Sequence, residues 1–368
     1  MAADVLSLRA LNRATLARQL LLERAEQSIL GAVEHLVGLQ AQEPPNPYLA
    51  LWSRLAGFHP EELARRLADR EVVRIVVMRG TIHLVTAADA LVLRPLMQPV
   101  LDAELARHRD FGPPLRDVDL TVVLDVARDR LAEPHTPSQL RAALAERFPD
   151  HDAAALAYAC RCHLALVQVP PRGLWRRSGQ VTVTTAEAWL GAPLATDPSI
   201  DEVVLRYLGA FGPATPGDVA AWSRLTGFRE VIDRLRPRLR SFRDERGREL
   251  FDLPDAPRPD ADTPAPPRFL PEYDNVLLSH ADRTRFMAED QRVWLFNAPT
   301  RVHGSVLADG LLAGTWSIDR DDGAVLVIRP VVTLSKRATA ALEAEGRRML
   351  RFLEPDIDGR EVRFDPIA

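Results

Sequence analysis

The sequence predicts an α+β protein in which three tandem winged helix-turn-helix modules precede a small antiparallel β-barrel. Three observations support this prediction. A helix-entry pattern occurs three times, an eight-residue pattern occurs twice, and a proline-rich segment at 254–267 separates a helix-rich region from a strand-rich one. The chain has 368 residues, of which 46% are hydrophobic and 27% charged, so it can bury the core that several domains need.

The helix-entry pattern is a polar side chain followed directly by proline. The side-chain oxygen caps the helix, and proline suits the first helical position because its missing N–H has no helical partner there. The pattern occurs at Asn46-Pro47, Thr136-Pro137 and Thr215-Pro216. Gln139 adds the spacing of a capping box to Thr136. We therefore expect a helix to begin at each of these places.

An internal repeat follows the first and third of these entries. Residues 51–58 and 221–228 read LWSRLAGF and AWSRLTGF, identical at six of eight positions. A second helix and two β-rich runs then follow in all three segments. In the first segment the helix is predicted at 60–70 and the β-rich runs at 72–78 and 81–86. In the second, the helix is predicted at 153–166 and the runs at 167–169 and 181–184. In the third, a helix at 230–239 precedes a hairpin through 246–247 to 253. Helix, turn, helix and hairpin is the plan of a winged helix-turn-helix.

These patterns divide the chain into five predicted parts. They are winged helix 1 with a linking helix over 88–109 (1–112), winged helix 2 (113–195), winged helix 3 (196–255), a linker (256–267) and the β-barrel (268–368). In the last part, alternating apolar runs at 276–278, 292–296, 302–307, 312–316 and 325–328 predict strands. A helix at 336–353 and a strand at 361–364 follow.

One segment of the first module, GLQAQEPPNP at 38–47, has the features of a site rather than a simple turn. Its three prolines force an extended connection, in which residues two apart point to the same side. Gln40 and Gln42 would then face one space. In the alternative interpretation, the two amides bond only to nearby backbone. An amide cannot act as a general base, but it can hold a water or donate to a developing charge.

A site without a catalytic acid or base suits a reaction whose leaving group is already activated. Loss of an N7-alkylated purine fits, because that base is cationic before any enzyme acts. Of 47 basic residues, Lys336 is the one lysine, and it does not lie in a Gly-Lys-Ser/Thr phosphate loop. This favours water over an imine-forming nucleophile. Glu43 is the neighbouring carboxylate that would serve if a base were needed.

Local clusters of arginine indicate where DNA would bind. The net charge of −4 argues against a generally basic nucleic-acid binder. However, residues 153–186 contain no acidic side chain, and the turn at 170–179 carries arginines with an exposed aromatic, as a DNA-contacting wing needs. The candidates there are Arg172, Trp175, Arg176 and Arg177. A solvated loop is the alternative. Eight arginines at 229–248 are weaker candidates, because internal ion pairs would explain them.

The cysteines, the apolar runs and the N-terminal residues indicate whether the protein binds metal and where in the cell it acts. Cys160 and Cys162 are predicted to be core thiols, and His163 beside them as a third metal ligand is the less favoured interpretation. We expect no metal and no cofactor. The chain also lacks an apolar run long enough for a membrane span and lacks signal-peptide features near Met1, so we expect a cytoplasmic protein.

Three motifs carry a family resemblance that extends over nearly the whole chain. They are GLQAQ at 38–42, MRGTIHL at 78–84, and LPEYD at 270–274 with His280 and Arg283. With them, the sequence resembles the AlkZ-like winged-helix DNA glycosylases. The resemblance implies tandem winged helices followed by a β-barrel, with Gln40 and Gln42 catalytic. A Gln-x-Gln signature marks the branch that acts on bulky alkylpurines and interstrand crosslinks, whereas a sister branch carries aspartate at the second position.

The function that this resemblance implies is that of a monofunctional DNA glycosylase acting as a monomer on double-stranded DNA that contains alkylated purines, above all N7-alkylguanine. Some relatives give self-resistance to a genotoxic natural product. Arg79, His83, Arg301 and His303 are further candidates for DNA contact, although His83 as a satisfied core residue is equally open. The alternative function is a non-catalytic winged-helix regulator. Such a regulator is usually a dimer on symmetric half-sites, whereas three unlike tandem modules suit a monomer.

Overall fold

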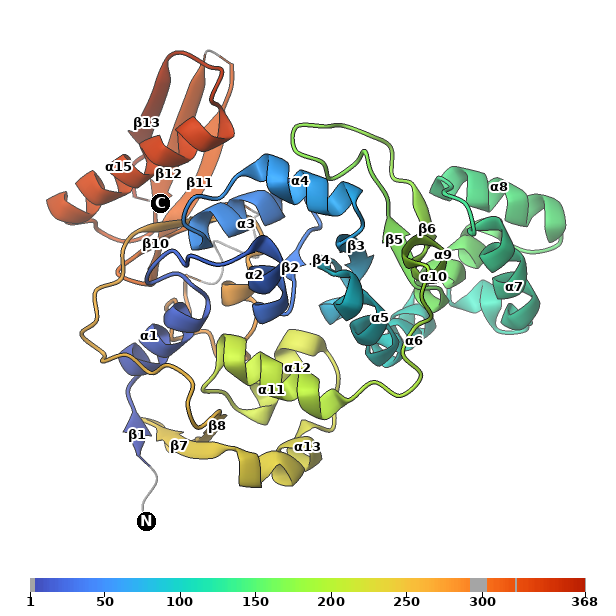
Figure 1. The fold of residues 1–368 in the computed structure, drawn as a ribbon, viewed down its shortest axis with the longest axis horizontal. Helices are drawn as coiled ribbons and strands as arrows, with labels where there is room; N and C mark the ends of the chain where they lie inside the picture. Colours follow the sequence, from blue (N-terminus) through green and yellow to red (C-terminus); the bar gives the residue numbers. More distant parts are fainter. Residues whose placement is uncertain (1–3, 292–302, 322, 368) are drawn as a thin grey trace.

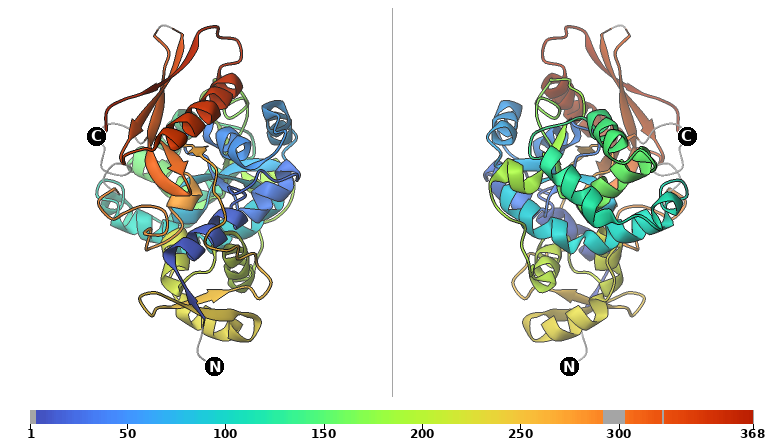
Figure 2. Two further views of the ribbon diagram at one scale, coloured as in Figure 1. Left: turned by 90° about the vertical axis from the view of Figure 1, so that its left-hand side faces the viewer. Right: turned by 90° about the vertical axis from the view of Figure 1, so that its right-hand side faces the viewer.

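The computed structural model describes residues 4–291, 303–321 and 323–367. Helices and sheets are mixed along this part of the chain, which confirms the α+β class. Figure 1 shows one sheet near the middle of the molecule, the C-terminal strands at one end and the third helix–hairpin segment at the opposite end. The two views in Figure 2 show the same arrangement from the sides.

The first segment has the expected order of helix, helix and hairpin, preceded by a short strand that belongs to the site. Its elements are β1 Val5–Leu6, α1 Leu8–Arg18, α2 Ile29–His35, β2 Leu39–Gln40, α3 Asn46–Arg54, α4 Pro60–Ala68, β3 Val72–Val76, η1 Met78–Gly80 and β4 Ile82–Thr86. The predicted single linking helix is wrong, because the chain forms α5 Ala87–Leu96 and α6 Gln98–Arg107 instead. Pro95 and Pro99 flank the break, and proline lacks the N–H that would continue the helix.

The second and third segments repeat the order of helix, helix and hairpin. The second comprises η2 Pro113–Leu115, α7 Leu120–Arg130, α8 Pro137–Arg147, α9 Ala153–His163, β5 Leu166–Gln168, β6 Val183–Thr185 and α10 Ala186–Leu190. The third comprises α11 Ile200–Phe211, α12 Pro216–Ser223, α13 Phe228–Leu235, η3 Arg236–Arg238, β7 Arg240–Asp244 and β8 Glu249–Asp252.

Two of the three predicted helix caps are confirmed. Thr136 with Gln139 and Thr215 with Asp218 both form reciprocal capping boxes. Asn46 does not cap α3, which begins one residue earlier than expected. Its amide instead donates to the carbonyl oxygen of Glu272 at 2.8 Å, a contact with the C-terminal part of the chain.

The hairpins of the first two segments join in one sheet of strand order β2-β4-β3-β5-β6. The register aligns Gln40 with His83, His83 with Ile75, and Ile75 with Val167. Directly opposed residues point to one face of a sheet, so Gln40 and His83 lie on the same face. Arg74 is aligned with Gln168 and therefore lies on the opposite face. Because this sheet crosses the predicted boundary at 112/113, the domain limits stay a prediction.

The described residues of the C-terminal part do not form the predicted closed barrel, because their strands make an open sheet of order β13-β12-β11-β10-β9. Its elements are β9 Arg268–Leu270, η4 Asn275–Leu277, β10 Gly304–Ala308, β11 Leu311–Asp319, β12 Ala324–Pro330, α15 Lys336–Leu353 and β13 Arg360–Phe364. Strand β13 follows α15 and pairs with β12 in parallel. Residues 276–278, expected to be a strand, fall largely in the 3-10 helix η4, and the run at 292–296 lies outside the described residues.

Candidate active site

Gln40 is positioned by a sharp reversal after α2. Val37 and Gly38 both have positive φ, of 54° and 89°. A Cβ added to Gly38 would lie 2.6 Å from the Cγ1 atom of Val85, so only glycine lets the chain turn this closely against β4. The chain then enters β2 beside β4, and the Ala41 N–H donates to the Ile82 carbonyl oxygen at 2.8 Å. The extended conformation is confirmed at Leu39–Gln40. The prediction that it continues through the prolines is wrong, because Gln42 and Glu43 lie in a bend and Pro44 and Pro45 in a turn that leads directly into α3.

The two glutamines lie in different environments. Gln40 is buried, at 8% exposure, and its Oε1 atom accepts a hydrogen bond from Arg79 Nη2 at 2.9 Å. Gln42 and Glu43 are exposed, in a bend before the prolines. The site thus combines a fixed amide with one that solvent reaches. That the two amides face one target stays a prediction.

Arg79 fixes the Gln40 amide and joins three parts of the chain. It has a positive φ of 62° in η1. Its Nη2 atom donates to Gln40, to Asn275 Oδ1 at 3.0 Å and to His83 Nε2 at 3.2 Å, while Nη1 donates to the Trp222 carbonyl oxygen at 3.1 Å. All four acceptors are uncharged. Burial, followed by the charges of Arg224 and Arg283, lowers the pKa of Arg79 to about 9, so it remains a cation at neutral pH.

His83 completes this network from inside the protein. It is fully buried, and its Nδ1 atom lies 3.0 Å from the Thr81 carbonyl oxygen. A carbonyl oxygen only accepts, so Nδ1 carries the proton and Nε2 accepts from Arg79. Burial, then the Arg79 charge, lowers the pKa of His83 to about 3, so the ring is neutral. Both ring nitrogens are thus occupied by protein groups, as expected for a satisfied core residue rather than a surface contact.

Stability should fall in mild acid because of His83 and the equally buried His280. Burial, followed by Arg285, lowers the pKa of His280 to about 3 as well. In the unfolded chain a histidine binds a proton below pH ~6.5. In the folded chain the lowered pKa keeps both rings neutral at these pH values, so protonation stabilises only the unfolded state. The free energy of unfolding should therefore drop by about 1 kcal/mol per buried histidine between pH 7 and 5.5.

Urea denaturation at the two pH values measures this effect, above the range in which carboxylates titrate. The exposed His151 supplies the control, since His151→Gln should leave the pH dependence unchanged. An unfolding free energy that is equal at pH 7 and 5.5 would contradict the buried neutral state of both rings.

Asn275 is a site residue that sequence reasoning missed. Besides accepting from Arg79, it donates from Nδ2 to the Gly38 carbonyl oxygen at 3.0 Å, and so binds both the residue that holds Gln40 and the turn before it. Its neighbour Asp274 is held by Arg54 through two hydrogen bonds, of 2.7 and 2.8 Å. The available signal was adjacency, because Asn275 directly follows the LPEYD motif.

Asn275→Ala should lower the rate of excision about tenfold, the size expected for losing one hydrogen bond to a charged group. Because Gln40 would be misplaced rather than removed, kcat should fall more than KM rises. Single-turnover kinetics on alkylated DNA measure the change. Ser279→Ala is the matched control, since Ser279 bonds to the Asn275 backbone and should have little effect on rate. Equal losses in both variants would indicate general loosening instead.

The turn at 170–179 packs against the C-terminal helix, so the prediction of an exposed aromatic is wrong. Trp175 stacks on Phe352 with ring centroids 5.3 Å apart and lies 4.9 Å from Tyr48. Arg176 pairs with Asp356 at 2.5 Å and donates to the Leu353 carbonyl oxygen. The aromatic cluster leaves Trp175 half-buried, because its large apolar surface is more stable against other rings than in water. Arg172 and Arg177 as DNA contacts stay predictions.

The remaining candidates divide between the site and the undescribed region. His303 lines a small cavity of about 200 Å³ together with Glu43, Pro45 and Trp316, so it lies near the Gln-x-Gln loop. Arg301 lies outside the described residues. Several arginines of 229–248 form ion pairs, including Arg234 with Asp201 and Arg248 with Asp244, which favours the ion-pair explanation of that cluster.

Neither core cysteine supplies a reactive thiolate. Cys160 and Cys162 are buried free thiols, and burial raises their pKa to about 12 and about 11. In the ranges that the structure covers, no group of three histidine, cysteine, aspartate or glutamate side chains is placed to hold a metal ion. Nor does any helix in those ranges have the length and apolar character to cross a membrane.

Comparison with known proteins identifies the class of enzyme. A family model described as DNA glycosylase AlkZ-like matches residues 33–352. The chain is 26% identical over 363 residues to the interstrand DNA cross-link repair glycosylase of Streptomyces sahachiroi, covering 91% of this chain and 93% of that protein. Its fold is similar to the solved structure of the Streptomyces sahachiroi DNA glycosylase AlkZ, with a TM-score of 0.78, 23% identity, and coverage of 98% of this chain and all of that one.

These matches show that the chain is a DNA glycosylase, an enzyme that hydrolyses the N-glycosidic bond of a nucleotide in DNA. It belongs to the AlkZ-like DNA glycosylase family.

Proposed function

We propose that this DNA glycosylase excises bulky N7-alkylguanine adducts from double-stranded DNA and unhooks interstrand crosslinks formed through such adducts. The observation that carries the proposal is the state of Gln40. Its carbonyl oxygen is bound by Arg79, while its Nε2 group has no hydrogen-bond partner among the described residues. The site thus presents a fixed, neutral donor. The name of the curated relative, an interstrand DNA cross-link repair glycosylase, supports the crosslink as substrate.

The chemistry required of such a site is mild because the substrate is already activated. The C1′–N9 bond breaks, and its electron pair moves to the purine and neutralises the positive charge that the N7 alkyl group imposes. The sugar becomes an oxocarbenium ion. Water then forms a bond from its oxygen to C1′ and releases a proton to solvent. The enzyme must place that water and stabilise the developing charge, and it needs no strong base.

The two glutamines have complementary roles in holding the water. Gln40 Nε2 donates to the water oxygen, because its own Oε1 is occupied by Arg79. The exposed Gln42 accepts a water proton through Oε1, which turns a water lone pair towards C1′. Arg79 polarises the Gln40 amide and strengthens its N–H as a donor. Arg79 and His83 thereby act inside the protein, as positioning residues rather than DNA contacts.

The three helix–hairpin segments act as winged helices in this proposal, with DNA running past the Gln-x-Gln loop. Arg172, Arg177 and His303 are the described candidates for DNA contact, and Arg301 remains one on sequence grounds alone. Arginine side chains would bind phosphates and make affinity fall with salt. The enzyme is proposed to act as a monomer, and self-resistance to a genotoxic natural product is its proposed biological setting.

An abasic-site assay tests the proposed function. Duplex DNA is treated with a monofunctional methylating agent or with a crosslinking nitrogen mustard, incubated with the protein, and heated in alkali. Excision should yield alkali-dependent strand breaks, and unhooking should convert the slow crosslinked band into single strands on a denaturing gel. The Gln40→Ala, Gln42→Ala double variant is the control. Tight binding to one undamaged sequence with alkylated DNA left intact would favour a regulator instead.

A further inference from the structure

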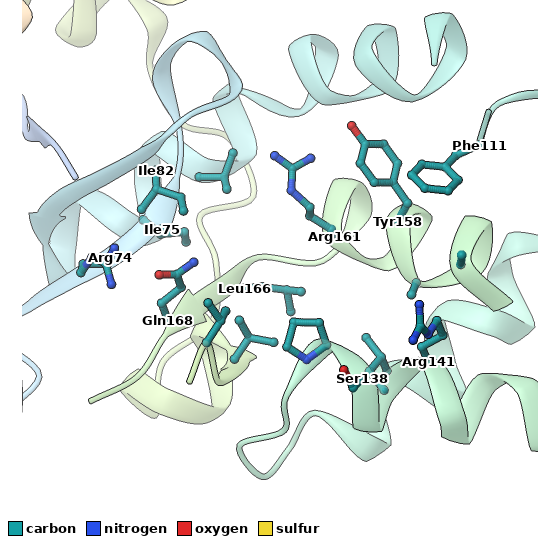
Figure 3. A pocket seen from close by; sticks show the side chains of 17 residues that line it. Arg74, Ile75, Ile82, Phe111, Ser138, Arg141, Tyr158, Arg161, Leu166 and Gln168 are labelled. Atoms are coloured by element: carbon teal, nitrogen blue, oxygen red, sulfur yellow. The ribbon is translucent and has the colours of Figure 1, made fainter. Parts of the chain in front are cut away.

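A second cavity, separate from the Gln-x-Gln site, lies on the opposite face of the central sheet. It has a volume of about 420 Å³, within the range of ~300–1,000 Å³ typical of small-molecule sites. Strands β3, β4 and β5 form its floor, and helices α8 and α9 contribute a wall. Figure 3 shows Arg74 and Gln168 near one end and Tyr158, Phe111 and Arg141 towards the other.

Arg74 and Gln168, which both line this cavity, carry unsatisfied hydrogen-bonding atoms just beneath its surface. Arg74 is 1% exposed, and one of its nitrogens, Nη2, donates to the Ala41 carbonyl oxygen at 2.9 Å. Among the described residues, its buried Nε and Nη1 atoms have no hydrogen-bond partner, and neither does the buried Oε1 atom of Gln168. Buried donors and acceptors are rarely left unpaired, because each costs about 1–3 kcal/mol. A cationic donor beside an orphaned carbonyl oxygen indicates a ligand that carries an acceptor next to an N–H.

The rest of the lining favours a flat aromatic body. Ile82, Leu166 and Val183 supply apolar surface, and the rings of Phe111 and Tyr158 lie 4.8 Å apart. The lining includes three arginines and no aspartate or glutamate. Arg161 is paired with Glu104 at 2.9 Å, which leaves Arg74 and Arg141 as the charges that favour a neutral or anionic ligand over a cationic one.

We propose that this cavity binds a purine base. The O6 carbonyl of guanine accepts a hydrogen bond from an arginine, and the neighbouring N1–H would donate to Gln168 Oε1; both groups remain available when N7 is alkylated. The ring would lie between the apolar walls. Such a base has two sources, which are the free base released by excision and a base displaced from the DNA helix. The free-base source rests on the proposed function.

A ligand bound in the cavity would affect the active site through Arg74. Its Nη2 atom binds the Ala41 carbonyl, the peptide group between the two glutamines. A ligand that draws Arg74 towards the cavity would weaken this bond and loosen the Gln-x-Gln loop. The released base would then inhibit excision from the far side of the sheet, without competing with DNA.

Calorimetric titration with 7-methylguanine tests the cavity directly, and indole serves as a bicyclic probe that lacks the carbonyl edge. The protein should bind 7-methylguanine at least tenfold more tightly than indole. Gln168→Leu removes the acceptor and Ala157→Phe fills the cavity, so each should weaken binding at least tenfold. The exposed Gln180→Leu and Ala145→Phe are matched controls and should bind like the wild type. Equal affinity for indole, or no binding of 7-methylguanine together with a negative result in the DNA arm, overturns the proposal.

A second arm distinguishes the two sources of the base. A duplex with an unpaired guanine next to a 2-aminopurine fluoresces more strongly when that guanine leaves the stack. If Ala157→Phe lowers the signal of the bound duplex, the base comes from DNA; if only the calorimetric arm responds, it is the free product. Both arms are repeated in Gln40→Ala, where base binding should persist without excision. Loss of the proposed function is thus separable from loss of the cavity.

Discussion

The rate of 7-alkylguanine excision should fall by ~100-fold or more in Gln40→Ala and in Gln42→Ala. This is the size of effect seen in other enzymes when a hydrogen-bond donor that stabilises the transition state is removed. Gln40→Ala deletes the Nε2 donor and leaves Arg79 with three of its four acceptors, so the fold should survive. Gln42 is exposed, so its replacement should leave stability unchanged. Single-turnover release of the base from a defined duplex measures both effects, and circular dichroism confirms folding.

The control for these variants is Gln27→Ala, which removes an exposed amide outside the site and should retain normal excision. Near-normal excision by both Gln40→Ala and Gln42→Ala would refute the assignment of the site. A loss of activity confined to Glu43→Gln would instead indicate general-base catalysis by that carboxylate, which is exposed beside Gln42.

Stability should fall by about 3–5 kcal/mol in Arg54→Met, because Asp274 would be left as a buried, uncompensated charge. The two side chains are 1% and 2% exposed and are joined by two hydrogen bonds. They connect α3 to the segment that carries Asn275, so excision should fall as well. Urea denaturation followed by circular dichroism measures the change in the free energy of unfolding.

The double variant Arg54→Met, Asp274→Leu should regain part of this loss, since it removes both charges together. Arg128→Met is the matched control. Arg128 pairs with Asp125 on the surface, where such ion pairs contribute about 0–1 kcal/mol, so the unfolding free energy should hardly change. A comparable loss in Arg128→Met would mean that the effect of Arg54→Met comes from its side-chain volume and not from its charge.

The parts of the fold that depend on nearby residues were predictable. The helix–helix–hairpin order follows from local periodicity and proline positions, whereas the three prolines after the glutamines form a bend and a turn instead of the extended connection predicted for them. Pairings between distant strands were not predictable. The parallel contact of β13 with β12 has no local signature, since alternation of apolar residues is the same for parallel and antiparallel edges. The predicted barrel was wrong for this reason.

In the active site, too, residues close together in the sequence were predictable and contacts between distant residues were not. Gln40 and Gln42 stand out in the sequence because they are close together before a proline block. Asn275 does not, because its contact with Arg79 spans 196 residues. The wing was misjudged on similar grounds. Arginines surround Trp175 in the sequence, and the contacts of its ring with the distant Tyr48 and Phe352, which half-bury it, have no local signature.

The network of Gln40, Arg79 and Asn275 has a consequence for the order of synthesis. A ribosome releases the N-terminal segments first, so β2 and β4 can pair long before residue 275 emerges. Until then Arg79 lacks one acceptor and the Gly38 carbonyl lacks its Asn275 donor. An unfinished chain would therefore have the three helix–hairpin segments before the Gln40 amide is fixed in place. Such coupling would leave nascent or truncated protein inactive on alkylated guanine until residue 275 has been added.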